Sequence, residues 1–149
     1  MPFYFSLQPV LRFRESFERR ERLRLQVIIR EVVNARQQWE GAKQDRASAL
    51  EQFATNLRRG MTAIELQFEQ ASDRARVRRI AALKDQFAKL EDLRRRQLEV
   101  FRKAQQQRKI LENLRDRQLA AYRLAQSRRT QQRLDERFLI TRGGQASSS

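Results

Sequence analysis

A narrow apolar stripe through residues 25–56 limits what this chain can fold into. Its members recur every three and four residues, in the order Leu25, Ile28, Val32, Ala35, Trp39, Ala42, Arg46, Ala49, Phe53 and Asn56. Such a stripe is too narrow to face a globular core, but it fits a coiled-coil seam, in which each side chain enters a hole on a facing helix. The helix that packs against this stripe must therefore be identified from the rest of the sequence.

The composition favours long helices over a compact domain. Of the 149 residues, 34% are charged and 8% are aromatic, and four Gly and two Pro are too few to separate many elements. The net charge of +15 attracts nucleic acid, anionic lipid or acidic protein surfaces. Arginine pairs recur along the whole length with acids among them, which is typical of a solvated helix surface.

The residues that most often carry chemistry are missing. Cys and His are absent, which excludes disulfides, thiolate sites and His-based acid–base or metal chemistry. No glycine-rich phosphate loop is present, and most carboxylates have an arginine three or four residues away, as in ion pairs on a helix surface. We therefore expect no enzyme activity, no metal and no cofactor. No apolar run is long enough to span a membrane, and no secretory signal is expected.

One turn is predicted, at residues 59–62. Gly60 suits the end of a helix, and Thr62 with Glu65 forms a capping box for the next one. A short connection makes the two helices antiparallel neighbours. We predict an all-α fold, an antiparallel two-helix coiled-coil hairpin with unequal arms. The helices span about 7–58 and 63–141 in a single domain over residues 1–142, and 143–149 form a disordered tail.

Folding about the turn pairs residues whose numbers sum to about 122. The predicted pairs are Ala42 with Ile80, Trp39 with Leu83, Ala35 with Phe87, and Val32 with Leu90. Arg46 then faces Arg76, and the two would repel unless each leans to a carboxylate. The second seam is expected to continue through Leu93 and Leu98. An earlier track, Val10, Phe13 and Phe17, is out of phase with Leu25, which predicts a stutter between them.

The two ends of the chain should lie side by side. The second helix is expected to project past the first from near Asn113 to Ile140, and its apolar residues there need a partner. The aromatic segment at residues 3–17 lies at the same end.

Several segments resemble the family of the bacterial flagellar export protein FliJ. The likeness covers about residues 3–137 and rests on order and spacing together. It is carried by Phe3, Phe5, Leu7, Val10, Leu11, Arg14 and Glu18, by 60–62 with 65–67, and by 108–114, Arg117, Tyr122 and 134–136. Thr130 departs from the pattern, since an acid is expected there.

The resemblance implies the fold and role of a non-enzymatic stalk. It would insert into the ring of the export ATPase hexamer and link it to the export gate protein FlhA and to export chaperones. It would lie in the cytoplasm, peripherally at the inner face of the cell membrane. Mapped here, the ATPase contacts would be Phe5, Leu7, Leu11, Phe13, Arg14, Phe17, Tyr122, Arg129, Leu134 and Phe138. The gate and chaperone contacts would be Leu66, Phe68, Ile80, Leu83 and Phe87.

Two other functions stay open on the residues alone. The charge of +15 would also suit a coiled coil that coats RNA or DNA. The basic residues are not concentrated before the heptads, however, so no specific nucleic acid is expected. The aromatic and arginine-rich N-terminus would suit a scaffold at a membrane surface.

Overall fold

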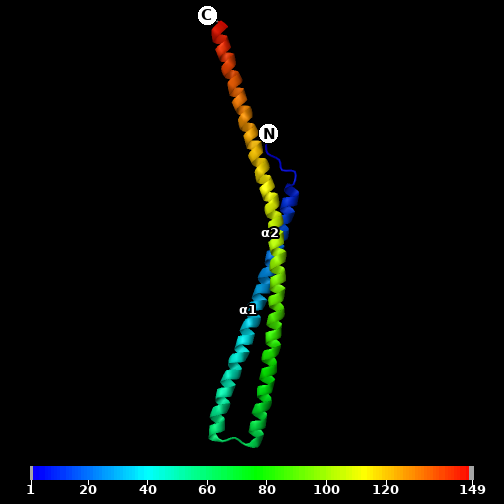
Figure 1. The fold of residues 1–149 in the computed structure, drawn as a ribbon, viewed down its shortest axis with the longest axis vertical. Helices are drawn as coiled ribbons and strands as arrows, with labels where there is room; N and C mark the ends of the chain where they lie inside the picture. Colours follow the sequence, from blue (N-terminus) through cyan, green and yellow to red (C-terminus); the bar gives the residue numbers. More distant parts are fainter. Residues whose placement is uncertain (1, 148–149) are drawn as a thin grey trace. The chain divides into compact units, whose positions relative to one another are not determined.

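Two long helices packed against each other make up the fold (Figure 1). The computed structural model describes residues 2–147. Helix α1 is Gln8–Arg59 and helix α2 is Ala63–Ser147, and there is no strand among the described residues. The prediction of an all-α antiparallel hairpin is confirmed.

The connection between the helices has the predicted turn chemistry. Gly60 has a φ of 102°, in the left-handed region that favours glycine. The Glu65 backbone N–H donates to Thr62 Oγ1 at 3.2 Å, and the Thr62 N–H donates to Glu65 Oε2 at 3.3 Å. This reciprocal pair is the predicted capping box, and it satisfies two backbone donors at the start of α2.

The structure divides into two compact units where the sequence predicts one domain. The hairpin unit is residues 19–103, and the end unit is residues 1–18 with 104–149. Both helices contribute to each unit. Each unit is described by itself below.

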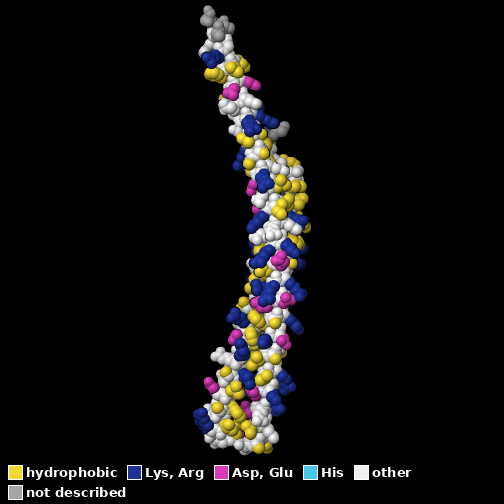
Figure 2. Space-filling view, in the orientation of Figure 1, with side chains coloured by type: hydrophobic (Ala, Val, Ile, Leu, Met, Phe, Trp, Pro, Cys, Tyr) yellow, Lys and Arg dark blue, Asp and Glu magenta, His cyan; other side chains and the backbone are white. Residues whose placement is uncertain are grey.

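The predicted stripe forms the seam of the hairpin unit. Leu25, Val32 and Ala35 on α1 are buried, and so is Leu83 on α2. The other stripe residues are half-buried, except Asn56, which is exposed. Figure 2 shows hydrophobic side chains along the contact between the helices, with Lys and Arg to either side. The partner of the stripe is therefore the same chain.

One ring contact joins residues of two neighbouring predicted pairs. Trp39 stacks on Phe87, with ring centroids 5.6 Å apart, one helical turn beyond the predicted partner Leu83. Side chains lean toward the N-terminus of their own helix. In an antiparallel pair, Trp39 and Phe87 therefore lean toward each other and meet between their two levels.

The predicted repulsion between Arg46 and Arg76 is avoided because each arginine lies near a carboxylate. The Arg46 guanidinium donates to both carboxylate oxygens of Asp73, at 2.9 and 3.2 Å, and Arg76 lies 4.0 Å from Glu69. The hydrogen bond from Arg46 holds the pKa of Asp73 below its ordinary value, and burial opposes this effect. Two facing arginines thus lie in one seam because each has a carboxylate.

The predicted stutter is wrong, because the seam keeps its phase through polar residues. Glu21 in the hairpin unit and Glu18 in the end unit are both buried, whereas Val10 and Phe13 are exposed. On α2 the seam passes through half-buried Arg94 and Gln97, and Leu93 is exposed. Polar side chains can occupy these positions because the buried carboxylates have hydrogen-bond partners across the seam.

Helix α2 is also longer than predicted. The sequence places its end near residue 141 and a disordered tail at 143–149, but the helix runs to Ser147. Glycine inside a helix costs only about 1 kcal/mol relative to alanine, so Gly143 and Gly144 do not have to end it. Residues 148–149 lie outside the described residues.

Candidate partner-binding surfaces

The N-terminal arm, residues 2–7, lies along α2 within the end unit. Phe5 is buried, and the Phe3 ring centroid is 5.6 Å from that of Tyr122. The Gln8 backbone N–H donates to the Phe5 carbonyl at 3.1 Å and turns the chain into α1. Aromatic rings bury large areas, so these contacts hold the arm against α2. The arm therefore covers the first part of the α2 segment that was predicted to project past the first helix from near Asn113.

The helix contact in the end unit combines a small apolar core with a buried ion pair. Leu11 is 0% exposed and Ala104 is 1% exposed. Arg108 donates to the buried Glu18 and, at 2.6 Å, to Glu112. Burial lowers the pKa of Arg108, but the hydrogen bonds to Glu112 and Glu18 outweigh it and raise the value above its ordinary one. The guanidinium is thus held as a permanent cation between two carboxylates.

An aromatic and basic face remains open on the end unit. Tyr4, Val10 and Phe13 are all exposed. The Phe13 and Phe17 rings stack with centroids 6.4 Å apart, and the Arg14 guanidinium carbon lies 5.8 Å from the Phe13 centroid. Stacked rings beside a cation form a rigid surface that costs little entropy to bind.

The C-terminal segment of α2, residues 127–145, has every side chain exposed. It carries five arginines against two acids, together with four large apolar residues: Leu134, Phe138, Leu139 and Ile140. Apolar side chains of this size on one uncovered helix are typical of a protein interaction site.

The structure separates the predicted ATPase contacts into three groups. Phe5 and Leu11 are buried and hold the end unit together. Arg14, Phe17 and Tyr122 are half-buried, and Arg14 donates to Gln107 Oε1 at 2.6 Å. The members open to a partner are Leu7, Phe13, Arg129, Leu134 and Phe138. Sequence reasoning left out of this set the exposed Tyr4, Leu139 and Ile140, although all are large and apolar.

The predicted gate and chaperone contacts lie mostly in the seam. Leu83 is buried, and Leu66, Ile80 and Phe87 are half-buried. Phe68, by contrast, is 70% exposed. Only Phe68 therefore offers a partner most of its side chain.

A hollow of about 580 Å³ adjoins Phe68 at the turn. Its lining includes Met61, Ile64 and Phe68, and we call these three residues the turn-end surface. Ile64 is largely exposed and was missed from the sequence. The sequence did indicate this exposure, because Ile64 lies in the first turn of α2 and is out of phase with the seam residues that follow.

Neither a metal-binding cluster nor a membrane-spanning helix occurs among the described residues. No group of three or more Asp or Glu residues that could hold a metal occurs among them. No helix within this part of the chain is long and apolar enough to cross a membrane.

Comparison with known proteins identifies a family. The family model described as flagellar FliJ protein matches residues 3–145, which is nearly the whole chain. No curated protein and no solved structure matched the chain.

Proposed function

Since the chain belongs to the flagellar FliJ protein family, we propose that it is the stalk of the flagellar export ATPase. The family is a non-catalytic component of flagellar protein export. In this proposal the end unit enters the ring of the ATPase hexamer. The hairpin unit links that ring to the export gate protein FlhA and to export chaperones. The protein acts at the inner face of the cell membrane, which it reaches through the export apparatus.

The C-terminal segment carries this proposal. It has four large exposed apolar side chains and an excess of arginine. A ring of identical subunits offers several equivalent surfaces to one helix inserted along its axis. Such a helix changes ATPase activity when it binds some subunit conformations better than others, since a ligand shifts an equilibrium only by its differential affinity.

The turn-end surface supports the second half of the proposal. Ile64 and Phe68 are exposed beside the hollow at the turn. These residues belong to the hairpin unit, whereas the C-terminal segment belongs to the end unit. Two separate apolar surfaces suit a protein with two partners.

The test is the rate of ATP hydrolysis by the purified export ATPase. The full chain is expected to raise the rate, and a chain ending at Gln126 is expected to lose that effect. The shortened chain keeps Leu11, Ala104 and the Phe3–Tyr122 contact, so circular dichroism should show that its helices persist. An unchanged ATPase rate on adding the full chain, or equal stimulation by the shortened chain, would contradict the proposal.

A further inference from the structure

A hollow of about 420 Å³ lies on the hairpin unit, away from the turn. It is lined by Arg20, Leu23, Arg24, Val27 and Ile28 of α1 and by Gln97 of α2, and we call it the Leu23 groove. Leu23 and Val27 are exposed and four residues apart, so they share one face of α1. Both are out of phase with the seam and do not hold the two helices together.

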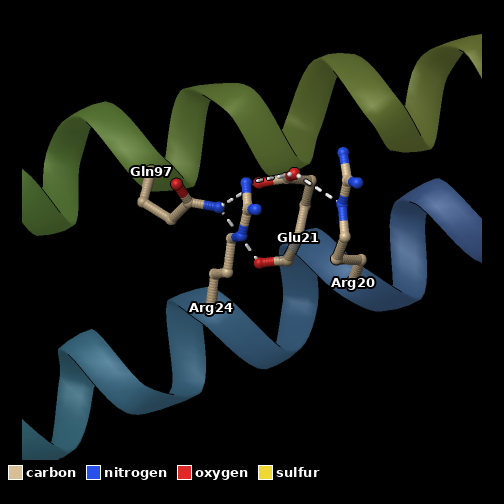
Figure 3. Close-up of polar contacts among 4 residues, drawn as sticks. All are labelled: Arg20, Glu21, Arg24 and Gln97. Atoms are coloured by element: carbon tan, nitrogen blue, oxygen red, sulfur yellow. Dashed lines mark hydrogen bonds and ion pairs between the residues drawn. The ribbon is translucent and has the colours of Figure 1, made fainter.

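The rim of the groove is organised by a buried carboxylate (Figure 3). Glu21 is 2% exposed and accepts a hydrogen bond at 2.6 Å from Gln97 Nε2, across the seam. Arg24 Nη1 donates to Glu21 Oε1 at 3.1 Å, and Arg20 Nε lies 3.5 Å from the same oxygen. Glu21 thus holds two guanidiniums in place beside the apolar floor.

Both arginine side chains are also open to solvent. More than half of each side chain is exposed, 57% for Arg20 and 58% for Arg24. A guanidinium has five N–H donors in a fixed fork that matches a carboxylate. Because Glu21 already restrains both groups, an incoming carboxylate loses less entropy in ordering them.

Positive charge predominates on α1 beside the arginine rim. Residues 19–24 contain four arginines and one acid, the buried Glu21, while the exposed Glu31 lies one turn beyond Val27. A partner that fills the groove therefore meets positive charge at the rim and apolar side chains on the floor.

We propose that the Leu23 groove binds an acidic amphipathic helix of a partner protein. Apolar residues of that helix, spaced by three and four, contact Leu23, Val27 and Ile28, and Asp or Glu residues beside them pair with Arg20 and Arg24. A second copy of this chain is disfavoured by its charge of +15. A membrane surface is disfavoured because the site is a hollow with only two exposed apolar side chains on its α1 face. This inference goes beyond the proposed function, which uses neither Leu23 nor Val27.

The test is the binding of labelled synthetic helices to the full chain. The probe is an amphipathic peptide of roughly 20 residues, above the length at which isolated helices are marginal. It has Leu on one face and Glu on both flanks, and the comparison peptide has Gln in place of Glu. We expect the Glu peptide to bind more tightly than the Gln peptide by about tenfold, because it adds ion pairs with the arginines.

Two valines provide the matched variants. Val27 is 52% exposed and lines the groove, while Val33 on the same helix is 51% exposed and does not line it. Val27→Glu should lower the affinity for the Glu peptide by about tenfold, because it removes apolar contact and adds repulsion between carboxylates. Val33→Glu makes the same change of charge and should leave the affinity within about threefold. Both variants should keep the circular dichroism spectrum of the parent, and Leu23→Glu serves as a second groove variant.

A second pair of variants tests the arginines at the rim of the groove. Arg24→Gln should lower the affinity for the Glu peptide and leave the affinity for the Gln peptide unchanged. Arg30→Gln, outside the groove lining, should change neither affinity. Equal weakening by Val27→Glu and Val33→Glu would show that net charge alone drives binding and would overturn the proposal. The proposal also fails if the Glu peptide does not bind. A third contrary result is that Val27→Glu abolishes binding to vesicles of anionic lipid while peptide binding is unchanged.

Discussion

Phe87 and Phe138 are the same residue type on the same helix, yet their surroundings are opposite. Phe87, in the hairpin unit, stacks on Trp39 at a centroid distance of 5.6 Å. Phe138, in the end unit, is 64% exposed within a segment of exposed residues, 127–145. The difference follows from what faces each residue, since α1 begins only at Gln8 and the arm contacts α2 at Tyr122.

Apolar residues therefore have two different roles in this two-helix protein. Residues in phase with the seam, such as Val32 and Leu83, are buried and hold the helices together. Residues out of phase or beyond the partner helix, such as Phe68 and Phe138, are exposed and remain available to other proteins. Stability and binding can therefore be altered separately by substitutions in the two classes.

The largest expected effect on stability is at Trp39. Trp39→Ala removes the stacking on Phe87 and leaves a gap in the seam, so we expect a loss of about 3 kcal/mol in the free energy of unfolding. Phe138→Ala should change it by less than about 0.5 kcal/mol. Urea denaturation followed by circular dichroism measures both. Similar losses for the two variants would remove the distinction between the classes.

A smaller loss is expected at the buried carboxylate Glu21. Glu21→Ala removes the carboxylate that accepts from Gln97, which keeps only the backbone carbonyl of residue 21, and it leaves Arg24 without its ion pair. The free energy of unfolding should fall by about 2 kcal/mol. The matched control is Glu51→Ala, an exposed glutamate on the same helix, with an expected change within about 0.5 kcal/mol. If Glu21→Ala is neutral in denaturant titrations, the polar part of the seam does not stabilise the hairpin unit.

The smallest effect should depend on pH, at Asp73. The hydrogen bond from Arg46 lowers the pKa of Asp73 below its ordinary value of 3.8. A lowered folded-state pKa stabilises the fold above the unfolded value, and this contribution is lost as the pH falls through the folded-state pKa. Thermal melts of Asp73→Asn should therefore lose stability at neutral pH and show a flatter acid limb than the parent. Asp45→Asn, at an exposed position on α1, is the control; an equally flat acid limb there would count against the Arg46–Asp73 pair.

The apolar stripe could be found from the sequence because its period is visible in residues such as Leu25 and Val32. The polar seam could not be found in this way, since Glu18 and Glu21 carry no hydrophobic signal. Counting back from Leu25 by four and three residues does reach Glu21, Glu18, Arg14 and Leu11, so strict spacing was a better guide than hydrophobicity.

The candidate surfaces were predictable only in part. Aromatic composition indicates a binding end, but it does not tell the buried Phe5 from the exposed Tyr4 next to it. That difference depends on how the arm lies along α2, which is a tertiary contact between Phe3 and Tyr122.

The most direct measurement compares Phe138→Ser and Phe68→Ser in two assays on the same purified proteins. The two side chains are similarly exposed, at 64% and 70%, and belong to different units. Phe138→Ser should lower the stimulation of the export ATPase and leave binding to the gate protein and chaperones intact. Phe68→Ser should do the reverse. If each substitution affects both assays equally, or if neither substitution affects either assay, the turn-end surface and the C-terminal segment do not bind separate partners.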